Sequence, residues 1–173
     1  YSGALNGVTA FNSTTFTATN GGTDAYIAKY NSAGTFQWAI EIGGAGNDGA
    51  RSISLDPTGN IYITGYFNGT VDFDPSAATF NIASTGGQDA FIAKYSSAGA
   101  FMWAARMGGA STDIGYGIYA DANGVYVTGA YLSSATMRSS GASTVTAVTA
   151  AAQVGNNMFV AEYDLNGIVQ WVA

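Results

Sequence analysis

The chain has 173 residues, 47% of them hydrophobic, and a net charge of −6 that rests on only 5 basic side chains. This acidic balance argues against nucleic acid and anionic membranes as partners, and no apolar run approaches the roughly 18 residues that a membrane-spanning helix needs. The chain contains no Cys, which excludes disulfides, and no His, which removes the usual general base and the commonest metal ligand.

The first predicted elements are a strand over Asp24–Tyr30, a turn at Asn31–Gly34 and a strand that contains Trp38 and ends at Gly43-Gly44. The turn places Gly where a positive φ is expected. Both faces of the strand over Asp24–Tyr30 are largely apolar, whereas a one-sided sheet would alternate apolar and polar residues. Sheets stacked face to face, as in the blades of a β-propeller, bury both sides.

The central part of the chain predicts four strands, at Ser52–Leu55, Ile61–Phe67, Asp89–Tyr95 and Ala100–Ala105. β-branched and aromatic residues dominate these segments, and turns at Asp56–Gly59 and Ser96–Gly99 separate them. Between the second and third strands lies a longer excursion, Asn68–Gln88, with two β-like patches at residues 70–73 and 79–82. No convincing helix is predicted, and we expect the Ala- and Thr-rich run Ser143–Gln153 to be strand or loop.

The third part repeats this pattern, with turns at Asp121–Gly124 and Asp164–Gly167 and a strand at Asn157–Tyr163. The repeat has a fixed period, because Lys29 and Lys94 are 65 residues apart (94 − 29). A fixed period of this length predicts a repeat architecture. We call each repeat a unit and number its strands first to fourth.

The phrase Gly108-Gly109, Asp113, Gly117-Ile118, Asp121, Asn123-Gly124 and Tyr126-Val127-Thr128-Gly129 closely resembles the SBBP repeat. The Asp-Ala-Phe-Ile-Ala-Lys-Tyr strand and the Trp of the fourth strand are part of the match. SBBP repeats form β-propellers in secreted and surface proteins of bacteria and archaea. The resemblance therefore implies an all-β, propeller-type array of four-stranded antiparallel units, incomplete at both ends, and an extracellular or cell-surface location.

On this basis we predict a partial blade at residues 1–44, a complete blade at 45–109 and a blade at 110–173 that is truncated in its last strand. Tyr1-Ser2-Gly3 is aligned with Tyr66-Phe67-Asn68, the end of a second strand. About 2.7 units (173/65) are too few for a closed propeller, which needs about 4 to 8 blades. We expect the open edges to be paired by further repeats of the same polypeptide or by other copies of the chain.

Two kinds of modification or ligand site are candidates. Asp72 and Asp74 alternate on one face of a strand, a spacing that could place two carboxylates on a metal ion such as calcium, or could simply form an exposed acidic edge. Asn12 and Asn68 begin sequons and are candidate glycan acceptors. No catalytic residue and no cofactor are predicted.

Other polar and aromatic residues recur once per unit. Asp48 and Asp113 follow the Gly-Gly turn and are expected to be turn caps that accept backbone N–H groups, although paired carboxylates can also serve acid–base chemistry. Lys29 and Lys94 are expected to be paired or snorkelling rather than catalytic, since Glu162 replaces them in the third unit. Trp38, Trp103 and Trp171 could line a sugar-binding surface or pack in the core, with Trp38 and Trp103 in equivalent buried environments.

Repetition without a singular site favours a non-catalytic structural module that assembles through its open edges into a filament or ring. The alternative is a propeller module whose loops bind a glycan or protein ligand. An enzyme is the third possibility, because catalysis usually needs a constellation that breaks the repeat, and a His-containing triad is impossible here.

Overall fold

The computed structural model describes the backbone of residues 2–6, 8–11, 14–17, 22–140, 144–149, 155 and 157–173, and the side chains of residues 22–140, 155 and 157–173. All regular structure in these residues is β-strand, which confirms the all-β prediction. No helix that could cross a membrane occurs in this part of the chain.

The strands in chain order are β1 (Ser2–Asn6), β2 (Val8–Phe11), β3 (Thr14–Thr17), β4 (Thr23–Tyr30), β5 (Phe36–Gly44), β6 (Gly49–Leu55), β7 (Ile61–Phe67), β8 (Thr70–Asp72), β9 (Asn81–Ala83), β10 (Asp89–Tyr95), β11 (Phe101–Gly108), β12 (Ile114–Ala120), β13 (Val125–Tyr131), β14 (Ser134–Arg138), β15 (Thr144–Thr149), β16 (Asn157–Tyr163) and β17 (Val169–Val172).

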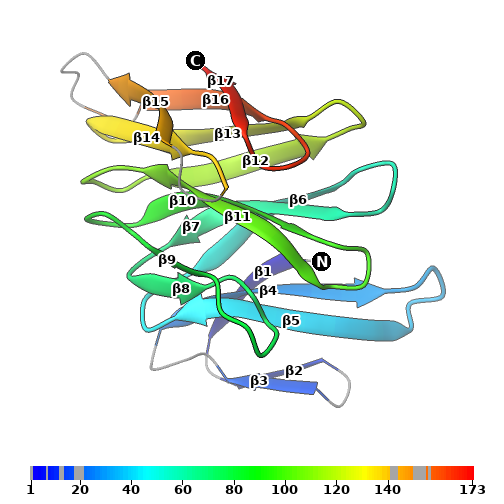
Figure 1. Ribbon diagram of the computed structural model, residues 1–173. Helices are drawn as coiled ribbons and strands as arrows, with labels where there is room; N and C mark the ends of the chain where they lie inside the picture. Colours follow the sequence, from blue (N-terminus) through cyan, green and yellow to red (C-terminus); the bar gives the residue numbers. More distant parts are fainter. Residues whose placement is uncertain are drawn as a thin grey trace.

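Three antiparallel sheets are stacked on one another (Figure 1). The second sheet places β6, β7, β10 and β11 side by side, and the third places β12, β13, β16 and β17 in the same order. These are the four strands predicted for a unit. In the first sheet, β1, β4 and β5 take the places of the second, third and fourth strands.

The excursion between the second and third strands folds as a hairpin that joins the preceding sheet. The β8–β9 hairpin pairs with β5, with Gly43 opposite Asp72. The β14–β15 hairpin pairs with β11, with Gly108 opposite Thr136. We call these the excursion hairpins. Each hairpin belongs in sequence to one predicted unit but extends the fourth strand of the unit before it. Strand pairing therefore crosses the predicted unit boundaries. The boundaries themselves stay a prediction.

The core lies between the sheets, and β10 contributes to both sides of the second sheet. Phe91, Ala93 and Tyr95 belong to the apolar cluster between the first and second sheets. Ala90 and Ile92 belong to the cluster between the second and third sheets. All five side chains are buried. The predicted two-sided burial of the third strand is therefore confirmed for the central unit.

The alignment predicted for Tyr1–Gly3 is wrong by three residues, as the strand register indicates. Ser2 pairs with Ile27 in the β1–β4 ladder. The residue that pairs with the equivalent Ile92 in the β7–β10 ladder is Thr64. Ser2 therefore corresponds to Thr64. The sequence comparison matched one tyrosine to another by identity, whereas the backbone ladder fixes which residues lie opposite each other.

Candidate functional site

The most distinctive contact in the molecule joins one unit to the next through a lysine and a tryptophan. Trp103 on β11 lies beneath the turn Asp164–Gly167 of the third unit, and its Nε1 donates a hydrogen bond to the carbonyl oxygen of Leu165 at 3.1 Å. Lys94 Nζ donates to the same oxygen at 2.9 Å. The turn of the third unit is thus fastened to two side chains of the second.

The same contact recurs between the first and second units. Lys29 Nζ donates to the carbonyl oxygen of Ser97 at 2.6 Å. The ring of Trp38 lies beside Gly99 of that turn, and a Cβ at this glycine would stand 3.4 Å from the ring. The two lysines are therefore paired with backbone carbonyls, as expected of a paired or snorkelling lysine, and they act as connectors between units.

The three tryptophans differ in burial, so the predicted equivalence of Trp38 and Trp103 is wrong. Trp103 is 6% exposed, Trp38 is half-buried and Trp171 is 42% exposed. Leu165 packs against the core that contains Trp103. Ser97 holds the same turn position beside Trp38, and its short side chain helps to line a cavity of about 880 Å³ there.

A buried aspartate holds the start of the first strand in the second unit and another does so in the third. Asp48 accepts hydrogen bonds from the backbone N–H groups of Gly44 and Asn68, both at 2.9 Å. Asp113 accepts the equivalent two bonds in the third unit. These contacts confirm the predicted turn caps. Burial raises the pKa of each carboxyl to about 6, against the opposing effect of the backbone hydrogen bonds.

These raised pKa values predict a fold that loses stability as the pH rises from about 4 to about 7. The folded state binds protons at Asp48 and Asp113 that the unfolded state, with ordinary pKa values near 4, has already released. We expect the free energy of unfolding to fall by about 1–3 kcal/mol for each aspartate across this range. Urea denaturation at several pH values measures the slope. Asp113→Asn should reduce it, and an unchanged slope in that variant would contradict the assignment.

One charged position changes sign between the first two units. The pKa of Glu41 on β5 is raised to about 7. Burial is the largest cause, and a hydrogen bond with Asp24 and the negative charge of Asp24 add to it. The equivalent residue of β11 is Arg106, whose Nη1 contacts Asp89 Oδ2 at 2.7 Å. This arginine was missed by the sequence analysis, although the replacement of Glu41 by Arg106 at the repeat spacing was a visible signal.

The candidate metal ligands Asp72 and Asp74 shape the turn of the β8–β9 hairpin. Asp72 Oδ1 accepts the backbone N–H groups of Asp74, at 3.0 Å, and Phe80, at 2.8 Å. Asp74 Oδ1 accepts the N–H of Ser76 at 2.9 Å. Within the described residues, no three or more Asp, Glu, His or Cys side chains are grouped so that they could hold a metal ion. A metal at Asp72 and Asp74 stays a prediction.

The two candidate glycan acceptors differ in what can be said of them. Asn12 lies outside the described residues. Asn68 is half-buried, and its Nδ2 donates to the carbonyl oxygen of Gly87 at 3.0 Å. A glycan attached to this nitrogen would replace one of its two hydrogens and leave one N–H for that bond. Glycosylation at both positions stays a prediction.

Comparison with known proteins supports the propeller repeat. The family model for SBBP, described as a beta-propeller repeat, matches residues 37–71, from β5 to β8. The predicted resemblance is confirmed for this segment. An uncharacterized WD repeat-containing protein of Acanthamoeba polyphaga mimivirus is 31% identical over 132 residues, which cover 64% of this chain and 10% of that protein. Regulatory protein FlaEY of Caulobacter vibrioides is 26% identical over 109 residues, which cover 63% of this chain and 11% of that protein. The chain spans about a tenth of the length of these curated relatives.

Proposed function

We propose that this chain is a non-catalytic structural repeat module of an extracellular or cell-surface protein, in which each unit completes its neighbour. The observation that carries the proposal is the excursion hairpin, which twice extends the fourth strand of the preceding sheet. The lysine and tryptophan contacts fasten the same neighbours a second time. In repeat proteins, contacts between adjacent units supply much of the stability.

The non-catalytic and extracellular parts of the proposal rest on separate grounds. The chain contains no His, and the carboxylates of Asp48 and Asp113 are occupied by backbone N–H groups rather than directed at a ligand. The location follows the resemblance to repeats of secreted and surface proteins. The SBBP match and the WD repeat-containing relative support a repeat or binding module.

The proposal extends to strand edges that have no partner among the described residues. Among the residues that the structure describes, β1 has no first strand beside it in the first sheet, unlike β7 and β13. The β2–β3 hairpin holds the place of an excursion hairpin, and its described residues pair only with each other. Unpaired edges of this kind are templates for other strands. Further repeats, from the same polypeptide or from other copies in a ring or filament, supply the missing strands.

The register identifies which residues of β1 would meet such a strand. Val160 and Ala173 exchange both backbone hydrogen bonds. The backbone N–H groups of successive residues in an antiparallel strand point alternately to the two neighbouring strands. This alternation places the N–H of Ala130 on the side of β12, away from β16. Ala4 on β1 holds the position equivalent to Ala130. Its N–H group therefore points to the free edge of β1.

Native mass spectrometry with electron microscopy tests this proposal. We expect species larger than the 17.6 kDa chain. Ala4→Pro should shift them toward the single chain, because proline removes the outward donor, and we expect the association constant to fall by about tenfold or more. Ala4→Val keeps the N–H and should leave the assembly intact. A soluble, monodisperse 17.6 kDa species from the unmodified chain would contradict the proposal.

A binding module for a glycan or protein ligand is the second candidate. One observation favours it, a groove between the first two sheets that contains two arginines.

A further inference from the structure

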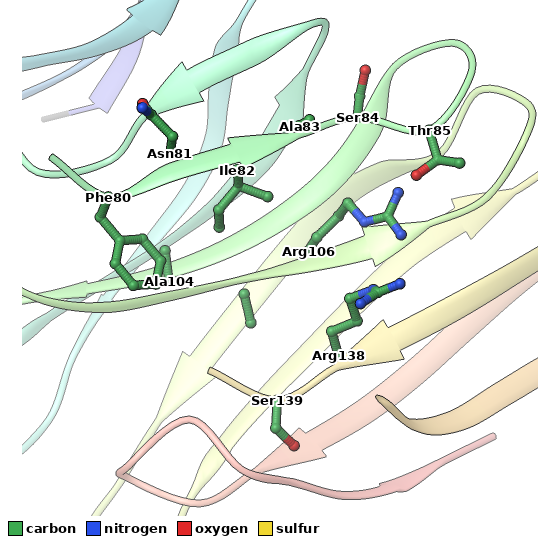
Figure 2. Close-up of a pocket in the computed structure, with 11 residues that line it drawn as sticks. Phe80, Asn81, Ile82, Ala83, Ser84, Thr85, Ala104, Arg106, Arg138 and Ser139 are labelled. Carbon is green, nitrogen blue, oxygen red and sulfur yellow. The ribbon is translucent and has the colours of Figure 1, made fainter. Parts of the chain in front are cut away.

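A groove of about 610 Å³ lies between β9 and the face formed by β11 and β14 (Figure 2). Phe80 and Ile82 point from the β9 side toward β11, where Ala104 lies opposite them. Arg106 and Arg138 occupy the other end of the groove. The volume falls within the range of small-ligand pockets, about 300–1,000 Å³. The groove is therefore apolar at one end and cationic at the other.

The two arginines lie side by side on neighbouring strands. Met107 of β11 is opposite Met137 of β14 in an antiparallel ladder, and Arg106 and Arg138 directly follow that pair on the two strands and line the same groove. In Figure 2 both guanidinium groups point the same way along the groove. Like charges placed directly opposite each other in a sheet destabilise it. An anion between them would remove that cost.

The nearby carboxylates leave part of this positive charge unmatched. Asp89 is fully buried and forms an ion pair with Arg106 at 2.7 Å. Asp113 also interacts with Arg106, but its two oxygens already accept backbone N–H groups. All 11 acidic residues of the chain lie in its described part, and none forms a salt bridge with Arg138 there. Arg138 Nε is buried without a hydrogen-bond acceptor.

The arginine pair also breaks the repeat. On the first sheet, the positions equivalent to Arg106 and Arg138 are occupied by Glu41 and Asp74. If packing alone required these positions to be basic, the first unit would share them. The change of charge at both positions together argues for a local property of the second unit.

We propose that this groove binds a carboxylate that carries a short apolar or aromatic group. Arg138 and the side of Arg106 that Asp89 leaves free hold the carboxylate, because guanidinium groups bind carboxylates through paired, charge-assisted hydrogen bonds. The apolar group packs against Phe80 and Ile82. The ligand is either a small organic acid or the C-terminal carboxylate of a peptide with an apolar last residue. The assembly proposed above plays no part in this inference.

Calorimetric titration of the chain with phenylacetate tests the site. We expect saturable binding, and we expect the uncharged isostere phenylacetamide to bind at least about tenfold more weakly, since it cannot form the charge-assisted bonds. Glucuronate, which has a carboxylate but no apolar group, should also bind at least about tenfold more weakly. Equal binding of phenylacetate and phenylacetamide, equal binding of glucuronate, or no binding of phenylacetate would overturn the proposal.

A variant of the cationic end gives a matched comparison. Arg138→Gln should weaken phenylacetate binding by about tenfold or more. Arg51→Gln makes the same change of net charge at a residue that lies over the Tyr66 ring, outside the groove, and should leave the affinity unchanged. Equal affinity in both variants would place the ligand elsewhere. Melting curves of both variants establish that each is folded.

Peptides distinguish the two sources of the ligand. A tetrapeptide that ends in phenylalanine with a free carboxylate should compete with phenylacetate, and its C-terminal amide should not. Tighter binding of the peptide than of phenylacetate identifies a peptide C-terminus as the source, and weaker binding identifies a small acid. Equal competition by the free peptide and its amide would contradict a site that recognises a carboxylate.

Discussion

Replacing Trp103 with alanine is expected to lower the free energy of unfolding by about 3–5 kcal/mol, the usual cost of removing a large buried aromatic side chain. The indole is 6% exposed. It lies edge-on to Tyr62 within its own sheet and donates to the carbonyl oxygen of Leu165 in the next unit. The variant thus loses core packing and a contact between the second and third units together.

Trp171 provides the matched control, because it holds the equivalent position in the third unit but is 42% exposed. We expect Trp171→Ala to cost less than about 1 kcal/mol, since little apolar surface returns to water. Urea denaturation followed by circular dichroism gives both values. Equal losses in the two variants would mean that contact with the following turn does not stabilise the tryptophan.

Replacing Gly167 with alanine is expected to cost about 2–5 kcal/mol, by two effects that a second glycine separates. Gly167 has φ +84°, where an L-residue is strained by about 1–2 kcal/mol. Its new Cβ would also stand 2.7 Å from the Trp103 ring and 2.8 Å from Ser140 Cβ. Overpacking of this kind costs about 1–3 kcal/mol more.

Gly34 occupies the same turn in the first unit and isolates the backbone effect. Its φ is +76°, and a Cβ there would meet no atom within 4 Å. Gly34→Ala should therefore cost only the strain of about 1–2 kcal/mol. The difference between the two variants, measured by urea denaturation, reports the contact between the turn and Trp103. If both variants lose the same free energy of unfolding, the turn is not in close contact with Trp103.

The strands were largely predictable because local sequence determines them. β7 and β10 have the predicted bounds, Ile61–Phe67 and Asp89–Tyr95. β-branched and aromatic residues fill both, and turn residues separate them from their neighbours. The partner of each excursion hairpin was not predicted. The β8–β5 ladder consists of Gly43 with Asp72 and Gly44 with Val71. A ladder of this length produces no sequence pattern from which the partner strand could be predicted.

The candidate site was predictable where it repeats and not where it changes. Asp48 recurs in a turn context, so its role as a cap could be inferred. Trp38 is half-buried beside a cavity that Ser97 of the next unit's turn also lines, and this neighbour is not visible in the sequence. Arg106 and Arg138 meet only because the β14–β15 hairpin joins β11. Their proximity follows from that pairing and not from their separation along the chain.

Amide hydrogen exchange at Ala4 tests whether further repeats complete the open strand edges. Its N–H points to the free edge of β1, whereas the neighbouring N–H of Gly3 points to β4. We expect the amide of Gly3 to be protected at all protein concentrations, and we expect protection of Ala4 to rise with concentration as copies associate. An Ala4 amide that exchanges freely at concentrations where the chain is assembled would contradict this expectation.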